Sequence, residues 1–224
     1  MRTQRMSLLT VVAAAAVGGC MGSNASDPTV VDLPASQLSI EPQIIDDDPA
    51  PSDGMLPVVV QFFRGNEFVK LAGNVALTCN DTPLLWTGLG YGARIPVPEA
   101  GTSLVFGHVR AGTTAKLTIK VPPRPVMVSP AEGSMLSRSA NLPIRYEPAA
   151  SAGIRPSASD GVIGVGGSEQ GDSGTAYLDV SVLHAGGGTI AVSRRFLSVP
   201  TGTGFGSVIA NYTITSANTQ VTWQ

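Results

Sequence analysis

The sequence predicts an all-β protein. Gly (26 residues) and Pro (17) are abundant among the 224 residues, whereas charged residues make up 13% and aromatic residues 5%. This balance is typical of short strands joined by many turns. Beyond the first twenty residues, no window of a dozen residues carries the i, i+3, i+4, i+7 apolar spacing of an amphipathic helix. Short runs instead alternate apolar and polar residues, as half-buried strands do.

Strand-like runs begin at Pro57, and turn residues separate them. In the first part of the chain, the expected strands are 58–63, 67–71, 73–79, 84–87, 103–109 and 115–121. The first two and the last two of these are expected to form hairpins, because a short Gly-containing turn joins each pair. The last strand alternates Leu117, Ile119 and Val121 with Thr118 and Lys120, which predicts one buried and one solvated face.

A run of prolines predicts a domain boundary. Pro122-Pro123-Arg124-Pro125 forms a stiff extended connector, because prolines so close together cannot enter a strand ladder. We therefore expect two small β-sandwiches, over 57–122 and 126–224. The alternative is one continuous sandwich in which both parts share a set of sheets, and a stable fragment of either part would then not exist.

The second part of the chain contains a glycine-rich stretch followed by four strong strands. Residues 153–174 contain one expected strand, over 162–165, and are expected to form a long loop or, alternatively, a glycine-softened hairpin. The strongest hairpin is predicted for 175–184 with 189–197, and 208–214 and 219–223 complete the sheet. The residues expected to face inward are Leu178, Val180, Val182, Ile190, Val192 and Phe196, with Arg194 the exception on that face.

The beginning of this second part resembles the opening strands of immunoglobulin-like or fibronectin type III modules in bacterial envelope proteins. The resemblance rests on the run from Val126 to Gly133, on Arg138, and on Leu142-Pro143-Ile144-Arg145-Tyr146. It implies an immunoglobulin-like sandwich in which Tyr146 takes the place of the aromatic core anchor. The Cys-Trp-Cys pattern of antibody domains is absent from the sequence, so only the architecture is carried over.

Residues 20–56 are expected to be a disordered, acidic, Pro-rich tether. Between Met21 and Phe63 the chain has seven acidic residues and no Lys or Arg. Low hydrophobicity with charge of one sign leaves too little apolar surface to offset the entropy of ordering. The run Asp46-Asp47-Asp48 is expected to be solvated, because consecutive aspartates lack the spacing that wraps ligands around calcium.

Residues 1–19 have the pattern of a secretory signal peptide: Arg2 and Arg5, an apolar run, and small residues before Cys20. The apolar run is shorter than the roughly 20 residues of a transmembrane helix. Val17-Gly18-Gly19-Cys20 resembles the lipobox of bacterial lipoproteins. The resemblance implies acylation of the Cys20 thiol and attachment to the membrane by lipid alone. Met21, in place of Asp, implies sorting to the outer membrane, with the periplasmic or surface face left open.

The chain has two cysteines. If Cys20 is acylated, Cys79 has no partner for an intramolecular disulfide. The alternation from Val75 to Cys79 places its thiol on the inward face, so we expect it to be buried and inert. The alternative is an exposed thiol that joins two copies of the protein.

One short string matches the residues around the nucleophile of trypsin-like serine proteases. Gly171-Asp172-Ser173-Gly174 carries the match, and His108, Asp160 and Ser173 occur in that family's chain order. Thr175-Ala176 departs from the family pattern, and a triad also needs a base beside the nucleophile and an oxyanion hole. We therefore expect a turn at Ser173, no enzymatic activity and no cofactor.

No metal site is expected. His108 and His184 are the only histidines, and they lie in different predicted domains, so a zinc site would need a further ligand and a close interface. Asp160, Glu169 and Asp172 could gather around calcium, but no loop pattern fixes them there.

Exposed aromatic rings are the usual route from a β-sandwich to sugar binding. Tyr91, between two glycines, and Trp223, near the C-terminus, are the candidates for a ligand-binding platform, whereas Trp86 is expected in the core. Basic residues after Phe63 are spread out rather than gathered in a stripe, which argues against nucleic-acid binding. The expected function is a non-enzymatic envelope module that binds another envelope component. The alternative is a carbohydrate-binding surface lipoprotein.

Overall fold

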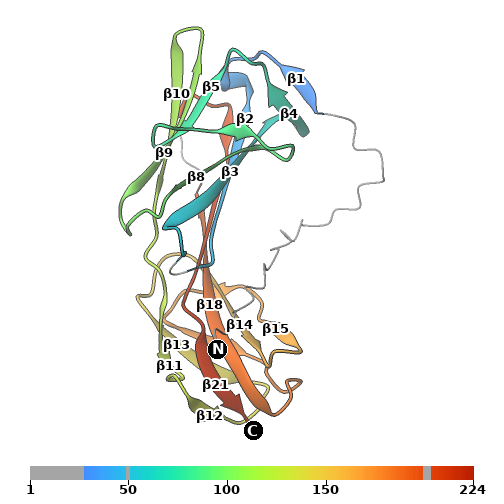
Figure 1. Cartoon of the computed structure of the whole chain (residues 1–224), viewed down its shortest axis with the longest axis vertical. Coiled ribbons are helices and arrows are strands. Elements are labelled where there is room, and N and C mark those ends of the chain that lie inside the picture. Colours follow the sequence, from blue (N-terminus) through green and yellow to red (C-terminus); the bar gives the residue numbers. More distant parts are fainter. Residues whose placement is uncertain (1–27, 49–50, 199–202) are drawn as a thin grey trace, which may run out of the picture.

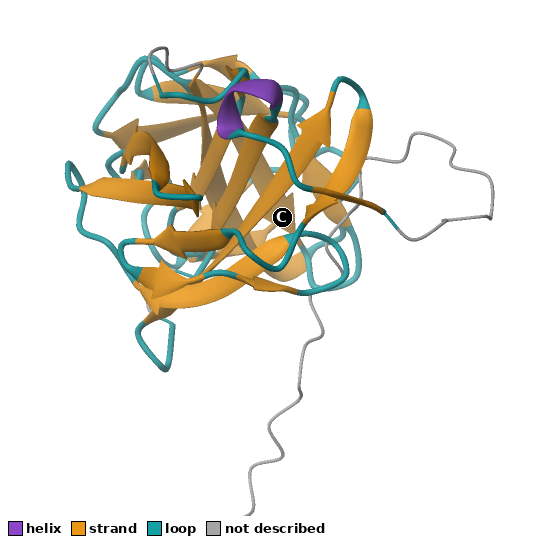
Figure 2. Cartoon of the chain, turned by 90° about the horizontal axis from the view of Figure 1, so that it is seen from above, coloured by secondary structure: helices purple, strands orange, loops and turns teal. Residues whose placement is uncertain are grey.

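The computed structural model describes residues 28–48, 51–198 and 203–224, and these form an all-β protein, as predicted. Within the described residues, the helical structure is one 3-10 turn, η1 (Ala35–Gln37), shown in purple in Figure 2. The strands belong to three sheets of fourteen, four and three strands. The predicted signal peptide (1–19) and Cys20 lie outside the described residues.

The first core lies between a large sheet and the four-stranded sheet (Figure 1). Buried residues of both sheets meet in it, among them Ile40, Phe62, Leu104, Leu117 and Tyr212. In the large sheet the strands on this side are β1 (Thr29–Val31), β4 (Glu67–Leu71), β3 (Met55–Arg64), β2 (Ser39–Asp46), β20 (Ala210–Thr215), β7 (Leu85–Trp86) and β8 (Tyr91–Pro96). The four-stranded sheet contains β10 (Thr113–Lys120), β9 (Ser103–Arg110), β5 (Ala76–Cys79) and β6 (Thr82–Pro83).

The second core lies between the three-stranded sheet and the other part of the large sheet. Its buried residues include Ile144, Tyr146, Ile154, Val192 and Trp223. The three-stranded sheet has the order β11 (Val126–Ser129), β13 (Leu142–Glu147), β17 (Thr175–Leu178). The facing strands are β12 (Ser134–Leu136), β21 (Thr219–Trp223), β18 (Gly186–Ser198), β14 (Gly153–Ser159), β15 (Gly164–Gly166) and β16 (Gln170–Gly171).

Strand β18 forms a long hairpin with β20 and β21, and this hairpin contributes residues to both cores. The first half of β18, Gly186 to Ile190, pairs with β21, and its second half, Ser193 to Ser198, pairs with β20. On its far side β20 pairs with β2 in parallel, and β19 (Ser207–Val208) pairs with the start of β2. The large sheet is therefore continuous between the two predicted parts, so residues 208–214 belong to the first core and not to a unit over 126–224.

The prediction of a disordered tether is wrong for residues 29–46, which form β1, η1 and β2. Leu38, Ile40 and Ile44 are buried in the first core. Pro42 is tolerated because it lies opposite the gap between β19 and β20, where the ladder on that side is interrupted. The composition of this segment did not predict that it is ordered, because the ladder partners of β2 include a strand more than 160 residues away in the chain.

The hairpin predicted for 175–184 with 189–197 does not form. β17 pairs with β13 in the three-stranded sheet, whereas β18 pairs with β14, β20 and β21. Leu178 and Val180 are buried as expected, but Val182 is 61% exposed. Alternation determines which residues of a strand face inward, and it does not specify the neighbouring strand.

The ordered β2 strand predicts that substitutions of two adjacent isoleucines will change stability by very different amounts. Ile44→Ala should lower the free energy of unfolding by about 2–5 kcal/mol, because it leaves a cavity in the first core. Ile45 is 51% exposed on the other face, so Ile45→Ala should change it by no more than about 0.5 kcal/mol. Urea unfolding of both variants measures this difference, and equal effects would argue against an ordered β2.

Candidate functional site

The two aromatic residues predicted to bind a ligand are buried, so that prediction is wrong. Tyr91 is 9% exposed, and its hydroxyl donates to the Leu71 carbonyl and accepts from the Leu71 N–H. Trp223 is 1% exposed, and its Nε1 donates to the Ser159 carbonyl. Glycines on both sides of Tyr91 suggested an exposed loop, but Tyr91 begins β8 and packs against Phe62 and Trp86. Neither ring presents a face to a sugar.

Cys79 is buried in the first core, as predicted. Burial raises the pKa of its thiol to about 12. The thiolate, which is the reactive form, is therefore scarce at neutral pH, and the alternative of an exposed dimerising thiol is excluded.

The residues of the protease-like string lie apart. His108 contacts Phe62 and Phe205 in the first core. The Ser173 hydroxyl, beside the second core, donates to the Thr175 carbonyl. Asp160 instead binds His184, with 2.8 Å between its Oδ2 and Nδ1 of the ring. The turn expected at Ser173 therefore fits its surroundings better than a triad.

The three carboxylates considered for calcium are also separate. Asp172 pairs with Arg194 and Glu169 with Arg195. Asp160 accepts hydrogen bonds from the N–H groups of Val162, Ile163 and His184, which lower its pKa. Within the described residues, no group of three His, Cys, Asp or Glu side chains could hold a metal ion.

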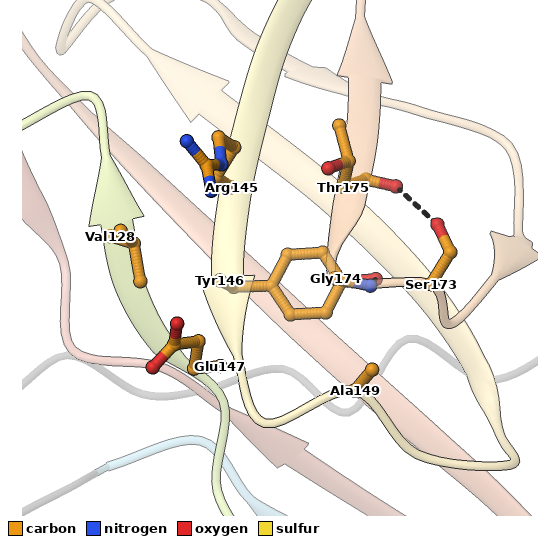
Figure 3. A pocket seen from close by; sticks show the side chains of 8 residues that line it. All are labelled: Val128, Arg145, Tyr146, Glu147, Ala149, Ser173, Gly174 and Thr175. Atoms are coloured by element: carbon orange, nitrogen blue, oxygen red, sulfur yellow. Dashed lines mark hydrogen bonds between the residues drawn. The ribbon is translucent and has the colours of Figure 1, made fainter.

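A polar pocket lies on the outer surface of the three-stranded sheet (Figure 3). Its volume is about 270 Å³. Its walls come from β11, β13 and the turn before β17, with Val128, Arg145, Glu147, Ser173 and Thr175 around it. The register between β11 and β13 shifts between Met127 and Ser129, so a bulge lies at Val128, beside the pocket.

Two oppositely charged side chains at the pocket have no ion-pair partner within the described chain. Arg145 and Glu147 are two residues apart on β13, and both are exposed. In Figure 3 the guanidinium of Arg145 and the carboxylate of Glu147 lie on either side of Val128. The pocket can thus offer hydrogen-bond donors and acceptors together with one apolar contact.

A buried ion pair lies close to this pocket. The side chains of Arg194 and Asp172 are both 0% exposed, and 2.5 Å separates Nε from Oδ2. The other Arg194 nitrogens donate to the carbonyls of Pro123 and Pro148. Asp172 also contributes to raising the pKa of Tyr146 to about 12, although burial of the phenol is the larger cause. Alternation placed Arg194 on the inward face of β18, but no sequence signal identified Asp172 as its partner.

Several sheet edges of the molecule are protected against further pairing. The amide of Gln170 donates to the Tyr177 carbonyl and accepts from the Tyr177 N–H. It thereby supplies both bonds that a neighbouring strand would make with that residue of β17. β10 carries the exposed Lys116 and Lys120, and lysines on an edge strand discourage pairing with another strand. The Lys116 N–H also donates a hydrogen bond to the Thr203 carbonyl.

β11 is the exception among these edges. It pairs with β13 on one side, and within the described residues its other edge has no ladder partner. Val126 is 62% and Val128 44% exposed. Pro125 and Pro130 limit this open edge to four residues, and no charged side chain within β11 protects it.

The chain matches no family model, and no curated protein matches it. None of the described segments forms an apolar helix of membrane-spanning length.

The buried ion pair predicts a large loss of stability when its acid is neutralised. Asp172→Asn should lower the free energy of unfolding by about 3–5 kcal/mol, because it leaves the Arg194 charge buried without its counter-ion. Glu169→Gln is the control, since the exposed pair with Arg195 should contribute no more than about 1 kcal/mol. Urea unfolding compares the two, and similar losses would contradict a special role for Asp172.

The buried His108 predicts a loss of stability in acid. Burial is the main cause that lowers its pKa, with the Arg110 charge adding to it, so the unfolded chain takes up a proton first. Stability should fall as pH drops below about 6.5, the ordinary histidine pKa. His108→Phe should flatten this part of the pH profile of urea unfolding, whereas His184→Gln, at an exposed position, should leave it steep. An unchanged profile in His108→Phe would contradict this assignment.

Proposed function

We propose that this chain is a lipid-anchored protein of the bacterial cell envelope that binds another envelope protein through the open edge of β11. The proposal assigns it no enzymatic activity and no cofactor. The observation that carries it is the contrast between β11 and β17: both are edges of the same sheet, and only the β17 edge is capped, by Gln170.

The chemistry of the open edge suits an extended segment of a partner protein. Adding a strand satisfies backbone groups that otherwise bind only water, and side-chain sites beside the edge supply specificity. Val126 and Val128 offer apolar contacts, and the adjacent pocket, with Arg145 and Glu147, suits a polar side chain of the added strand. Because the edge is four residues long, the added segment is short.

We infer an immunoglobulin-like sandwich for the strands around the second core. This inference is supported by the packing of β11, β13 and β17 against β21, β18 and β14, with Tyr146 buried between the sheets. The chain changes sheets between β11 and β12, since β11 pairs with β13 and β12 with β21. The resemblance in this region implies the sandwich architecture alone, and the adhesive or assembly role is our proposal.

Attachment through an acylated Cys20, and sorting to the outer membrane, rest on the lipobox resemblance and on Met21. Carbohydrate binding is not carried forward, because it depended on Tyr91 and Trp223 and both are buried.

Photo-crosslinking in intact cells tests this function. A photo-reactive residue at Val126 should capture one envelope protein, because its side chain lies on the open edge. The same residue at Thr118, exposed on the protected edge strand β10, should not capture that protein. Mass spectrometry identifies the captured protein.

Capture at Val126 should be lost in a Cys20→Ser background, which removes the acylation site. It should also be lost when Val128→Lys places a charge beside the edge, and Val162→Lys, at an exposed loop position, should leave it intact. Equal capture at both positions, or capture that survives Val128→Lys, would count against the edge as the binding site.

A further inference from the structure

Strands β1 and β4 lie at the opposite end of the molecule from β12 and β21 (Figure 1). Residues of these strands and their neighbours form an apolar surface with an aromatic centre. We call it the aromatic patch. Val30, Phe63, Phe68 and Lys70 lie on the outer face of β1, β3 and β4. Trp86 of β7, which pairs with Tyr91 and packs partly against the first core, and Leu89, in the turn between β7 and β8, complete the patch.

The contacts within the aromatic patch join its members into one surface. Phe68 lies opposite Phe63 in the ladder, with 5.8 Å between the ring centroids, and it stacks on Trp86 at the same distance. The Lys70 ammonium lies 5.3 Å from the centroid of Trp86. Val30 pairs with Lys70 across β1 and β4 and therefore lies on the same face.

Leu89 extends the patch over the neighbouring turn. Its carbonyl accepts a hydrogen bond from Gln61, which is on the same face of β3 as Phe63. The Leu89 side chain is 77% exposed and that of Val30 62%. The two aliphatic side chains thus project on either side of a half-buried aromatic cluster, and exposed apolar surfaces of this kind mark sites of interaction.

The position of this patch relative to the lipid attachment site indicates what covers it. The described chain enters β1 at Thr29, which pairs with Val69, the residue after Phe68, and whose hydroxyl bonds to Glu67. Nine residue steps lead from Cys20 to Thr29. Even fully extended, they span no more than about 30 Å. An acyl chain on Cys20 therefore keeps Thr29, at the margin of the aromatic patch, within this distance of the bilayer, so that the patch can reach the lipid surface.

The composition of the patch matches a membrane interface. Tryptophan is enriched at the headgroup level, because its ring is amphipathic. Exposed leucine and valine side chains enter the acyl boundary, and a lysine beside them is attracted to anionic lipids. The acidic Glu67 at the margin is paired with Arg64, so its charge does not stand alone against the lipid surface.

We propose that the aromatic patch docks on the lipid bilayer, with Leu89 and Trp86 at the depth of the headgroups. This inference rests on the proposed acylation of Cys20. The lipid retains the protein at the membrane, and the patch sets its orientation. The second core and the open edge of β11 then point away from the bilayer, where a partner protein can reach them.

The two tryptophans of the chain make the test specific, since Trp86 lies in the patch and Trp223 in the second core. The full-length protein is produced in a bacterial host, purified and reconstituted into vesicles of phosphatidylethanolamine and phosphatidylglycerol with brominated acyl chains. Bromine quenches only fluorophores at the membrane. We expect loss of part of the emission in the wild type and no such loss in Trp86→Phe, in which Trp223 alone emits.

Substitutions at exposed positions complete the test. Leu89→Asp should abolish the quenching while the protein still floats with the vesicles, and Val162→Asp, at an 83% exposed position beside the second core, should leave it unchanged. A floating protein whose Trp86 is not quenched overturns the docking inference and leaves the lipid anchor intact. Dimers that Leu89→Asp dissolves would also overturn it, in favour of a second copy as the occupant.

Failure of the proposed acylation is recognised separately. Mass spectrometry that finds no acyl chain on Cys20 removes the anchor from the proposed function. The Cys20 thiol is then coupled to a maleimide lipid in the same vesicles, since Cys79 is buried and unreactive. Quenching of Trp86 in this coupled protein still supports docking by the patch, and its absence overturns it.

Discussion

The buried guanidinium of Arg194 is the interaction on which the arrangement of the two cores depends. It lies on β18, the strand common to both, and binds Asp172 together with the carbonyls of Pro123 and Pro148. Arg124, in the connector itself, binds Asp46 and the carbonyl of Thr215. Arg194 of the large sheet thus binds the connector, and Arg124 of the connector binds the large sheet. Each guanidinium donates hydrogen bonds to backbone carbonyls.

The large sheet contributes strands to both cores. β18 runs from the second core, where it pairs with β21, into the first core, where it pairs with β20. β20 joins β2 in parallel within the first core. The aromatic patch and the open edge of β11 lie on sheets that pack around these two cores. A surface that orients the first core on a membrane therefore also affects where the β11 edge points.

The edges of the sheets differ in how well they are protected against further pairing. The Gln170 amide caps the edge of β17, and two exposed lysines lie on β10. β1, β12 and β15 have three residues each and therefore offer little backbone to pair. β11 has neither a capping amide nor a lysine. A short, apolar edge beside a polar pocket favours a specific extended segment over indiscriminate aggregation, because its prolines limit the length that can pair.

The sequence by itself determined the all-β class, the inward faces of most strands and the burial of Cys79, because alternation and glycine or proline placement are local properties. Only the tertiary structure decided that residues 29–46 are ordered, that β17 and β18 lie in different sheets, and that Tyr91 and Trp223 are buried. The Arg194–Asp172 pair and the open β11 edge were likewise decided there. Each of these depends on which strand becomes whose neighbour. Strand neighbours are set by contacts between residues that are distant in the chain. The local alternation of apolar and polar residues does not specify these contacts.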